Sequence, residues 1–238
     1  SFFIWDNPSA PNAMSNMIMI KVANKIPQLK QLKILSLVSN IITVDPKKLI
    51  SPLLNLPYLE SFRLEYDNNR KPANLNAITK FIISQRELTE LTLKYLGKVE
   101  DREMKAIFDA ITSLSKLEIL DLSLPDLKNA KKGKLLIAKM LTCLPHLKEF
   151  ALCCGSYPDE DKILADLMSA VVGLKKLQIL RLYITFNSVT EKGYEALREY
   201  MRRLHKLLFL KFPSGYLKGW MSLDEIIHEY AHKCDLTI

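Results

Sequence analysis

Leucine residues return along this chain at nearly constant intervals, and this repetition constrains the fold more than any other feature. Seven of them each precede a short apolar alternation, with spacings of 27, 29, 29, 30, 30 and 30 residues: Leu32, Leu59, Leu88, Leu117, Leu147, Leu177 and Leu207. Periods of about 20 to 50 residues are typical of proteins built from stacked repeats. The whole chain is therefore predicted to consist of stacked repeats.

Three further apolar columns accompany these anchors. Three residues before them lie Leu29, Leu56, Leu114, Leu144, Leu174 and Leu204, with Gln85 as the exception. Three residues after them lie Leu35, Phe62, Leu91, Leu120, Phe150, Leu180 and Leu210, and two residues further on lie Leu37, Leu64, Leu93, Leu122, Leu152, Leu182 and Phe212. A separation of two residues is the period of a β-strand with one buried face. Each repeat is therefore predicted to contain a short strand.

The stretches between these strands have helical periodicity. Within residues 100–114, for example, the apolar positions Met104, Ile107, Phe108 and Ile111 follow the i, i+3, i+4, i+7 spacing of one helix face. Thr190 and Asp159 are predicted N-caps for two of the helices. Pro57 and Pro145 come directly after the column that closes a helix, where helices usually stop. Each repeat is thus predicted to be a strand, a turn and a helix of about three turns.

Stacking such units buries the strand face and the helix face that no single unit can cover. We expect an α/β solenoid with a parallel sheet on a concave face, helices on a convex face and horseshoe curvature. Residues 1–238 would form a single domain of about seven full repeats with partial units at both ends. The partial units are residues 2–5 with a helix over 12–26, a final helix over 222–232, and the start of a strand at Leu236. Because Ser1 falls within the pattern, we expect the chain to be a fragment of a longer one.

The units match L-x-x-L-x-x-L-x-L, as in residues 29–37 and 174–182, and so resemble leucine-rich repeats of the helix-containing, ribonuclease-inhibitor-like type. That family usually places Asn or Cys three residues after the last Leu. Here Asn40 alone fits, and the later positions hold Asp67, Leu96, Pro125, Gly155, Thr185 and Gly215. The pattern is more similar to the divergent repeats of NOD-like receptor sensor regions or of leucine-rich-repeat effectors that bacteria deliver into host cells. The resemblance implies a platform that binds a protein partner, in the cytoplasm, with a role in innate immunity or as a bacterial effector.

The composition narrows the class of protein further. The chain is 48% hydrophobic and carries a net charge of +8, so a sizeable core and a basic surface are both expected. No apolar run approaches the roughly 20 residues needed to span a bilayer. The basic residues recur throughout the chain, which favours an ordinary solvated surface over nucleic-acid binding. The nucleic-acid or anionic-membrane alternative would use Arg198, Arg202, Arg203 and Lys206.

Two motifs were considered as sites of chemistry. His228-Glu229-Tyr230-Ala231-His232 matches H-E-x-x-H, which on a helix places two imidazoles one turn apart to bind zinc. Only six residues follow His232, leaving little room for the usual downstream ligand. Cys153 and Cys154 are neighbours in a predicted strand, so one should face the interior and the other the concave surface. We expect no enzyme and no cofactor, with a zinc hydrolase using His228 and His232 as the alternative.

The concave face remains the best candidate for a binding surface. Residues flanking the last two Leu columns point out of the core there. Eight of them are predicted to contact a protein partner: Arg63, Glu65, Thr92, Lys94, Asp121, Arg181, Tyr183 and Lys211. Arg and Tyr are enriched among residues that dominate the binding energy of protein interfaces.

Overall fold

The computed structural model describes residues 1–5, 12–39, 45–66, 75–95, 99–124, 133–154, 160–184, 189–204, 207, 209–211 and 235–236. The strands are β1 (Phe2–Trp5), β2 (Ile34–Ser39), β3 (Ser61–Tyr66), β4 (Glu90–Tyr95), β5 (Ile119–Leu124), β6 (Glu149–Cys154), β7 (Ile179–Ile184), β8 (Phe209–Lys211) and β9 (Asp235–Leu236). The α-helices are α1 (Asn12–Ala23), α2 (Pro46–Ile50), α3 (Asn76–Ser84), α4 (Asp101–Ile111), α5 (Gly133–Thr142), α6 (Glu160–Gly173) and α7 (Glu191–Arg202). Two 3-10 helices are η1 (Ile26–Gln28) and η2 (Ser51–Asn55).

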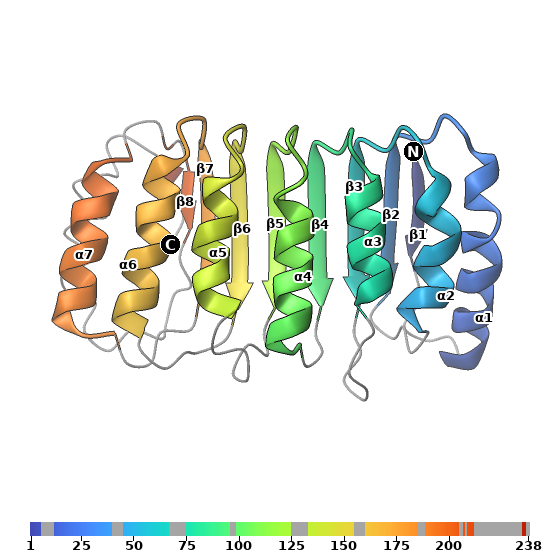
Figure 1. The fold of residues 1–238 in the computed structure, drawn as a ribbon, viewed down its shortest axis with the longest axis horizontal. Coiled ribbons are helices and arrows are strands. Elements are labelled where there is room, and N and C mark those ends of the chain that lie inside the picture. The colour runs from blue at the N-terminus through green and yellow to red at the C-terminus, as the bar shows by residue number, and fades with distance from the viewer. Residues whose placement is uncertain are drawn as a thin grey trace.

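The strands form one parallel sheet in which each strand lies beside the next one in sequence, from β1 to β9. The α-helices of the described chain cover one face of this sheet, as Figure 1 shows. We call the other face, which carries no described helix, the open face. The predicted succession of strands and helices in a parallel α/β array is confirmed. The horseshoe curvature stays a prediction.

The leucine columns build the core between the sheet and the helices. All seven anchor leucines are buried, and so are the described residues of the two strand columns, such as Leu35, Leu122 and Phe150. The helices supply the other half of the core, where Phe81 of α3 lies 4.6 Å from Phe62 of β3 between ring centroids. Because each unit buries its apolar side chains against its neighbours, the stack holds itself together through contacts between successive repeats.

Hydrogen bonds at the start of the strands fix the register between repeats. The carbonyl of Lys33 accepts the backbone N–H groups of Glu60 and Ser61, and the same arrangement recurs in later units at the carbonyls of Glu60, Thr89, Glu118 and Lys148. Ion pairs reinforce this edge at Lys33–Glu60 (2.7 Å), Glu87–Lys116 (2.5 Å) and Glu118–Lys148 (2.7 Å). These pairs are exposed, so each is worth about 1 kcal/mol or less.

The helical periodicity of residues 100–114 is confirmed by α4. Met104, Ile107, Phe108 and Ile111 are buried on one face. The helix begins with a capping box, in which the side chain of Glu103 accepts a hydrogen bond from the backbone N–H of Glu100 at 3.3 Å. This reciprocal cap satisfies N–H groups that have no partner within the helix.

The unit between β2 and β3 departs from the predicted three-turn helix. Its connection consists of the five-residue α2 followed directly by the 3-10 helix η2. Pro52 lies in the first turn of η2 and has no backbone N–H to continue the α-helical bonding of α2. This is also the shortest repeat, with 27 residues between Leu32 and Leu59. A short unit with an internal proline therefore replaces part of its α-helix with the tighter 3-10 form.

Leu29 also differs from its column, because its side chain is 44% exposed while Leu56, Leu114 and Leu144 are buried. Leu56, Leu114 and Leu144 lie in connections that have a described repeat on each side. Leu29 follows η1 in the first such connection of the described stack, which has another described connection on one side. Ile26 is buried in the same connection instead.

The partial repeats predicted at the two ends have different outcomes. β1 and α1 occupy the positions expected for residues 2–5 and 12–26, and β9 forms the strand expected near Leu236. The helix predicted over residues 222–232 lies outside the described residues. None of the described helices combines the length and the apolar character needed to cross a membrane.

Candidate functional site

The open face is built from three rows of side chains that run across the strands. The first row holds Ile34, Ser61, Glu90, Ile119, Glu149 and Ile179. The second row holds Ser36, Arg63, Thr92, Asp121, Ala151 and Arg181, and it is continued in register by the backbone of Lys211. The third row holds Val38, Glu65, Lys94, Ser123, Cys153 and Tyr183. Seven of the eight residues predicted to bind a partner therefore lie in the second and third rows, and the backbone of Lys211 continues the second row. Their role in binding stays a prediction.

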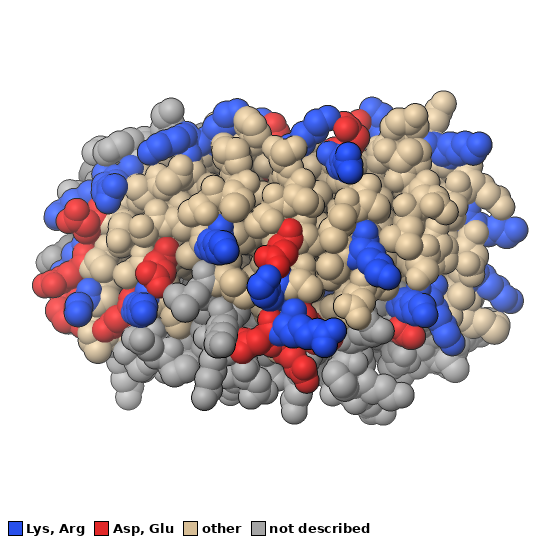
Figure 2. All heavy atoms as spheres, viewed as in Figure 1, with Lys and Arg blue, Asp and Glu red and all other residues tan. Residues whose placement is uncertain are grey.

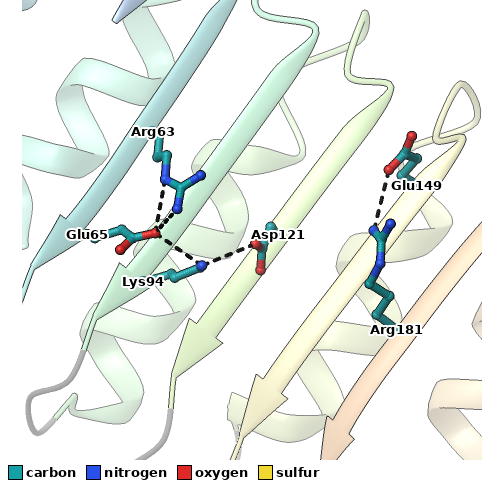
Figure 3. A network of polar contacts seen from close by, with 6 residues as sticks. All are labelled: Arg63, Glu65, Lys94, Asp121, Glu149 and Arg181. Atoms are coloured by element: carbon teal, nitrogen blue, oxygen red, sulfur yellow. Dashed lines mark hydrogen bonds and ion pairs between the residues drawn. The ribbon is translucent and has the colours of Figure 1, made fainter. Parts of the chain in front are cut away.

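Four of these residues form one charged network across β3, β4 and β5 (Figure 3). The Glu65 carboxylate accepts a hydrogen bond from Arg63 Nε at 2.9 Å and a further contact from the same guanidinium. Lys94 Nζ lies 3.1 Å from the same Glu65 oxygen and 3.8 Å from Asp121 Oδ2. The sequence alternation had placed these residues on one surface, and the parallel register brings their charges into contact.

A second ion pair lies further along the sheet. Arg181 of β7 donates to the Glu149 carboxylate of β6, with 3.4 Å between Nη1 and Oε2 (Figure 3). Glu149 belongs to the first row, which the sequence analysis did not include among the candidate binding residues. The same two-residue alternation that identified Arg63 and Glu65 could have found it, because Ser61, the first-row residue of their strand, lies on the same face.

The two acidic residues of the larger network have opposite pKa shifts. Burial acts to raise the pKa of the Glu65 carboxyl, but hydrogen bonds from Lys94 and Arg63 outweigh it and bring that pKa below its ordinary value. Burial raises the pKa of the Asp121 carboxyl, because the more distant charges of Lys94 and Arg63 offset only part of the cost of desolvation. The surroundings therefore favour the ionised form of the Glu65 carboxyl and disfavour the ionised form of the Asp121 carboxyl.

Two adjoining hollows shape the open face. The first has a volume of about 610 Å³ and lies over β2, β3 and β4, with lining residues that include Ile34, Ser36, Val38, Arg63 and Glu90. The second has a volume of about 480 Å³ and lies over β4 to β7, with lining residues that include Lys94, Asp121, Cys153, Arg181 and Tyr183. Thr92 and Ile119 line both. Volumes of about 300–1,000 Å³ are typical of binding pockets.

Three small side chains of the open face are largely hidden from solvent. Ser36, Ser123 and Ala151 line the hollows, and each is less than 9% exposed. Ser123, for example, lies between Lys94 and Cys153 in register. Small side chains thus lie beside larger ones along the rows of the open face.

The cysteine pair behaves as predicted. Cys154 is buried in the core, while Cys153 is partly exposed and lines the second hollow. Neither forms a disulfide within the described part of the chain. Within the part of the chain that the structure describes, no three His, Cys, Asp or Glu side chains gather in an arrangement suited to a metal ion. His228 and His232 lie outside that part, so their zinc-binding alternative stays a prediction.

Two of the basic residues named in the nucleic-acid or anionic-membrane alternative contact neighbouring residues of their own repeat, and that alternative stays a prediction. Arg198 donates to the Glu191 carboxylate at 3.2 Å, and the Arg203 guanidinium lies 5.9 Å from the Tyr200 ring centroid. Lys206 lies outside the described residues. On the helix side of the molecule, Lys and Arg are interspersed with Asp, Glu and uncharged residues (Figure 2).

Comparisons with known proteins give distant similarities. No protein-family model matches the chain, and no curated protein matches its sequence. Among solved structures, the leiomodin-1 actin-binding site 2 is 14% identical, with a TM-score of 0.48, covering 68% of this chain and 92% of that one. An internalin from Listeria monocytogenes is 16% identical, with a TM-score of 0.32, covering 81% of this chain and 64% of that one.

Proposed function

We propose that this chain is a protein-interaction module that recognises a protein partner with the open face of its sheet. The observation that supports the proposal most directly is the hollowing of that face between charged side chains from successive strands. Protein interfaces combine apolar centres with polar rims in this way. The partner would cross the strands and contact several repeats at once.

The rigidity of the surface favours recognition. Residues at alternate positions, such as Leu35, Leu37 and Leu64, are buried directly beneath the open face. Ion pairs within the face hold Arg63, Lys94 and Arg181 in place before any partner arrives. A surface ordered in advance loses less conformational entropy on binding. This arrangement suits a recognition platform, and we propose that the chain has no catalytic activity and requires no cofactor.

We further propose that residues 1–238 are one leucine-rich-repeat solenoid of the ribonuclease-inhibitor-like type, with the open face as the concave side of a horseshoe. In this proposal the chain works in the cytoplasm, as the ligand-sensing or autoregulatory region of an innate immune receptor. The alternative is a bacterial effector that binds a host protein. The repeat pattern of the sequence supports both contexts equally, and they share the use of the open face.

The proposal is tested by affinity capture with matched variants. Arg181→Glu combined with Tyr183→Ala changes the charge and shape of the second hollow. Lys80→Glu combined with Ile83→Ala makes the same kind of change at exposed positions on α3, on the helix side. Proteins captured by the natural chain and the α3 variant but lost with the open-face variant would support the proposal. Partners lost only with the α3 variant would place recognition on the helices and overturn it.

The zinc-hydrolase alternative is tested separately by metal analysis of the purified protein. The H-E-x-x-H match at His228–His232 is the observation behind it. A stoichiometric zinc content that falls in His228→Ala would support a metal site and contradict the proposed absence of a cofactor. Zinc well below one equivalent would favour the binding module.

A further inference from the structure

The first hollow of the open face has an apolar and hydroxyl-bearing lining. Ile34 is 37% exposed, and Val38 and Ile119 contribute partly buried aliphatic surface beside it. Ser36, Ser61 and Thr92 supply hydroxyl groups between them. The uncharged part of this hollow would therefore accept an aliphatic or aromatic side chain, whose transfer out of water is favourable.

Three charged residues line the same hollow, and two of them neutralise each other. The Arg63 guanidinium is paired with Glu65, which also accepts a contact from Lys94. Glu90 is exposed, and no cation of the described chain forms an ion pair with it. Its neighbours across the first row are Ser61 and Ile119, neither of which carries a charge. Among the described residues that line this hollow, Glu90 therefore carries the negative charge that no ion pair compensates.

The second hollow provides an internal comparison. Its four charged residues form two pairs of opposite sign, Lys94 with Asp121 and Arg181 with Glu149. The two hollows thus have similar size and lie on the same rows, but differ in their uncompensated charge. A partner that spans the open face would therefore find an unpaired carboxylate in the first hollow, which favours a cation. In the second hollow it would find charges that are already paired with each other.

We infer that the first hollow receives a basic side chain adjacent to an apolar one from an extended segment of the protein partner. The Lys or Arg of that segment pairs with Glu90, while its aliphatic or aromatic neighbour packs among Ile34, Val38 and Ile119. Charge complementarity of this kind selects between partners more than it adds affinity. The inference rests on the proposed protein-binding role of the open face and specifies the chemistry of the segment bound there.

The test is a selection from a displayed library of random linear peptides. The natural chain, Glu90→Gln, Glu90→Lys and the control Glu195→Lys are used as targets; Glu195 is an exposed carboxylate on α7, on the helix side. We expect the natural chain and the control to enrich peptides with Lys or Arg beside an apolar residue. Glu90→Lys should instead enrich acidic peptides. Matching circular dichroism spectra would establish that all four targets are folded alike.

The affinity of one enriched peptide for each variant then measures how much the Glu90 charge contributes to binding. A partly exposed ion pair is worth up to about 1 kcal/mol, so Glu90→Gln should weaken binding by about two- to fivefold, and Glu90→Lys by about tenfold. Peptides that are lost with Thr92→Arg but show no dependence on the charge at position 90 would overturn this inference while leaving the open face as the binding surface. Peptides unaffected by Thr92→Arg and by Arg181→Glu would overturn the proposed function itself.

Discussion

Asp161 and Thr190 join two successive repeats through a double hydrogen bond. The Asp161 carboxylate, in the first turn of α6, accepts from the backbone N–H of Thr190 at 2.8 Å and from its hydroxyl at 2.5 Å. Thr190 is the N-cap residue of α7, but its own side chain does not cap that helix. The negative charge of Asp161 therefore lies at the positive end of the α7 dipole, where it is stabilising. One repeat supplies the cap for the helix of the next.

Removal of this carboxylate should loosen the junction between α6 and α7. We expect Asp161→Ala to lower the free energy of unfolding by about 1–2 kcal/mol, the usual cost of losing a helix cap. Asp166→Ala provides the matched control, since Asp166 lies on the same helix and is only partly exposed. Urea denaturation of both variants measures the difference. Equal effects of the two substitutions would show that the Asp161–Thr190 contact contributes nothing specific.

Gly193 is expected to be intolerant of a side chain for the same reason. A Cβ at this position would lie 2.3 Å from Asp161 Oδ1 and 2.8 Å from Val189 Cγ1. Alanine within a helix is ordinarily more stable than glycine by about 1 kcal/mol. We expect Gly193→Ala to destabilise the protein instead by about 1 kcal/mol, because Asp161 has to move and its cap is lost.

A double-mutant cycle separates this effect from general crowding. In the Asp161→Ala background, Gly193→Ala should cost less than in the natural chain, because the cap is already absent. The measurement is again the free energy of unfolding in urea. An identical cost in both backgrounds would mean that Val189, rather than Asp161, sets the requirement for glycine.

The repeated core was predictable from sequence, whereas this junction was not. The leucine columns predict burial because each residue repeats the same environment, as the burial of Leu91, Leu120 and Leu180 confirms. The prediction of Thr190 as an N-cap found its position but not its hydrogen-bonding partner. Asp161 is 29 residues away, and only the stacking of α6 beside α7 brings the two together. Contacts between repeats depend on how neighbouring units are aligned, which local periodicity does not specify.

Leucines of the repeating columns should contribute to the free energy of unfolding according to how deeply each one is buried. Leu122 is fully buried, while Leu29 is 44% exposed despite belonging to the same repeating pattern. We expect Leu122→Ala to lower the free energy of unfolding by about 2–5 kcal/mol. Leu29→Ala should cost about 1 kcal/mol or less, as for a substitution outside the packed core. Chemical denaturation compares them, and similar losses would contradict the exposure of Leu29.

The opposite pKa shifts of Glu65 and Asp121 predict that neutralising these two carboxyl groups has opposite effects on the free energy of unfolding. Because folding lowers the pKa of Glu65, its ionised form stabilises the native state above the ordinary pKa of 4.5, and this contribution is lost as pH falls through the lowered value. Because folding raises the pKa of Asp121, its ionised form costs stability at neutral pH. That cost disappears as pH falls through the raised value to the ordinary 3.8.

At pH 7, Glu65→Gln should therefore lower the free energy of unfolding and Asp121→Asn should raise it. Both differences from the natural chain should shrink on acidification, because each carboxyl is then protonated in the folded and the unfolded state. Thermal denaturation over a series of pH values measures them. Changes of the same sign in the two variants at pH 7 would contradict the roles assigned to the two carboxylates.

The candidate surface was only partly predictable. Alternation along the strands placed Arg63, Lys94 and Arg181 on one face, as found. It did not indicate that Lys94 contacts a residue on each neighbouring strand, because that depends on register across the sheet. The first row, including Glu149, was missed because the predicted alternation began two residues too late in each strand. Hollows depend on the relative size of side chains in adjacent repeats and could not be predicted from any single repeat.

Photo-crosslinking from the two sides of the molecule tests the central claim most directly. A diazirine-bearing residue is placed at Thr92, which lines both hollows, or at Lys80 on the helix side. If the open face is the recognition surface, the protein partner should be captured covalently from position 92 and not from position 80. Capture from position 80 alone would contradict the account.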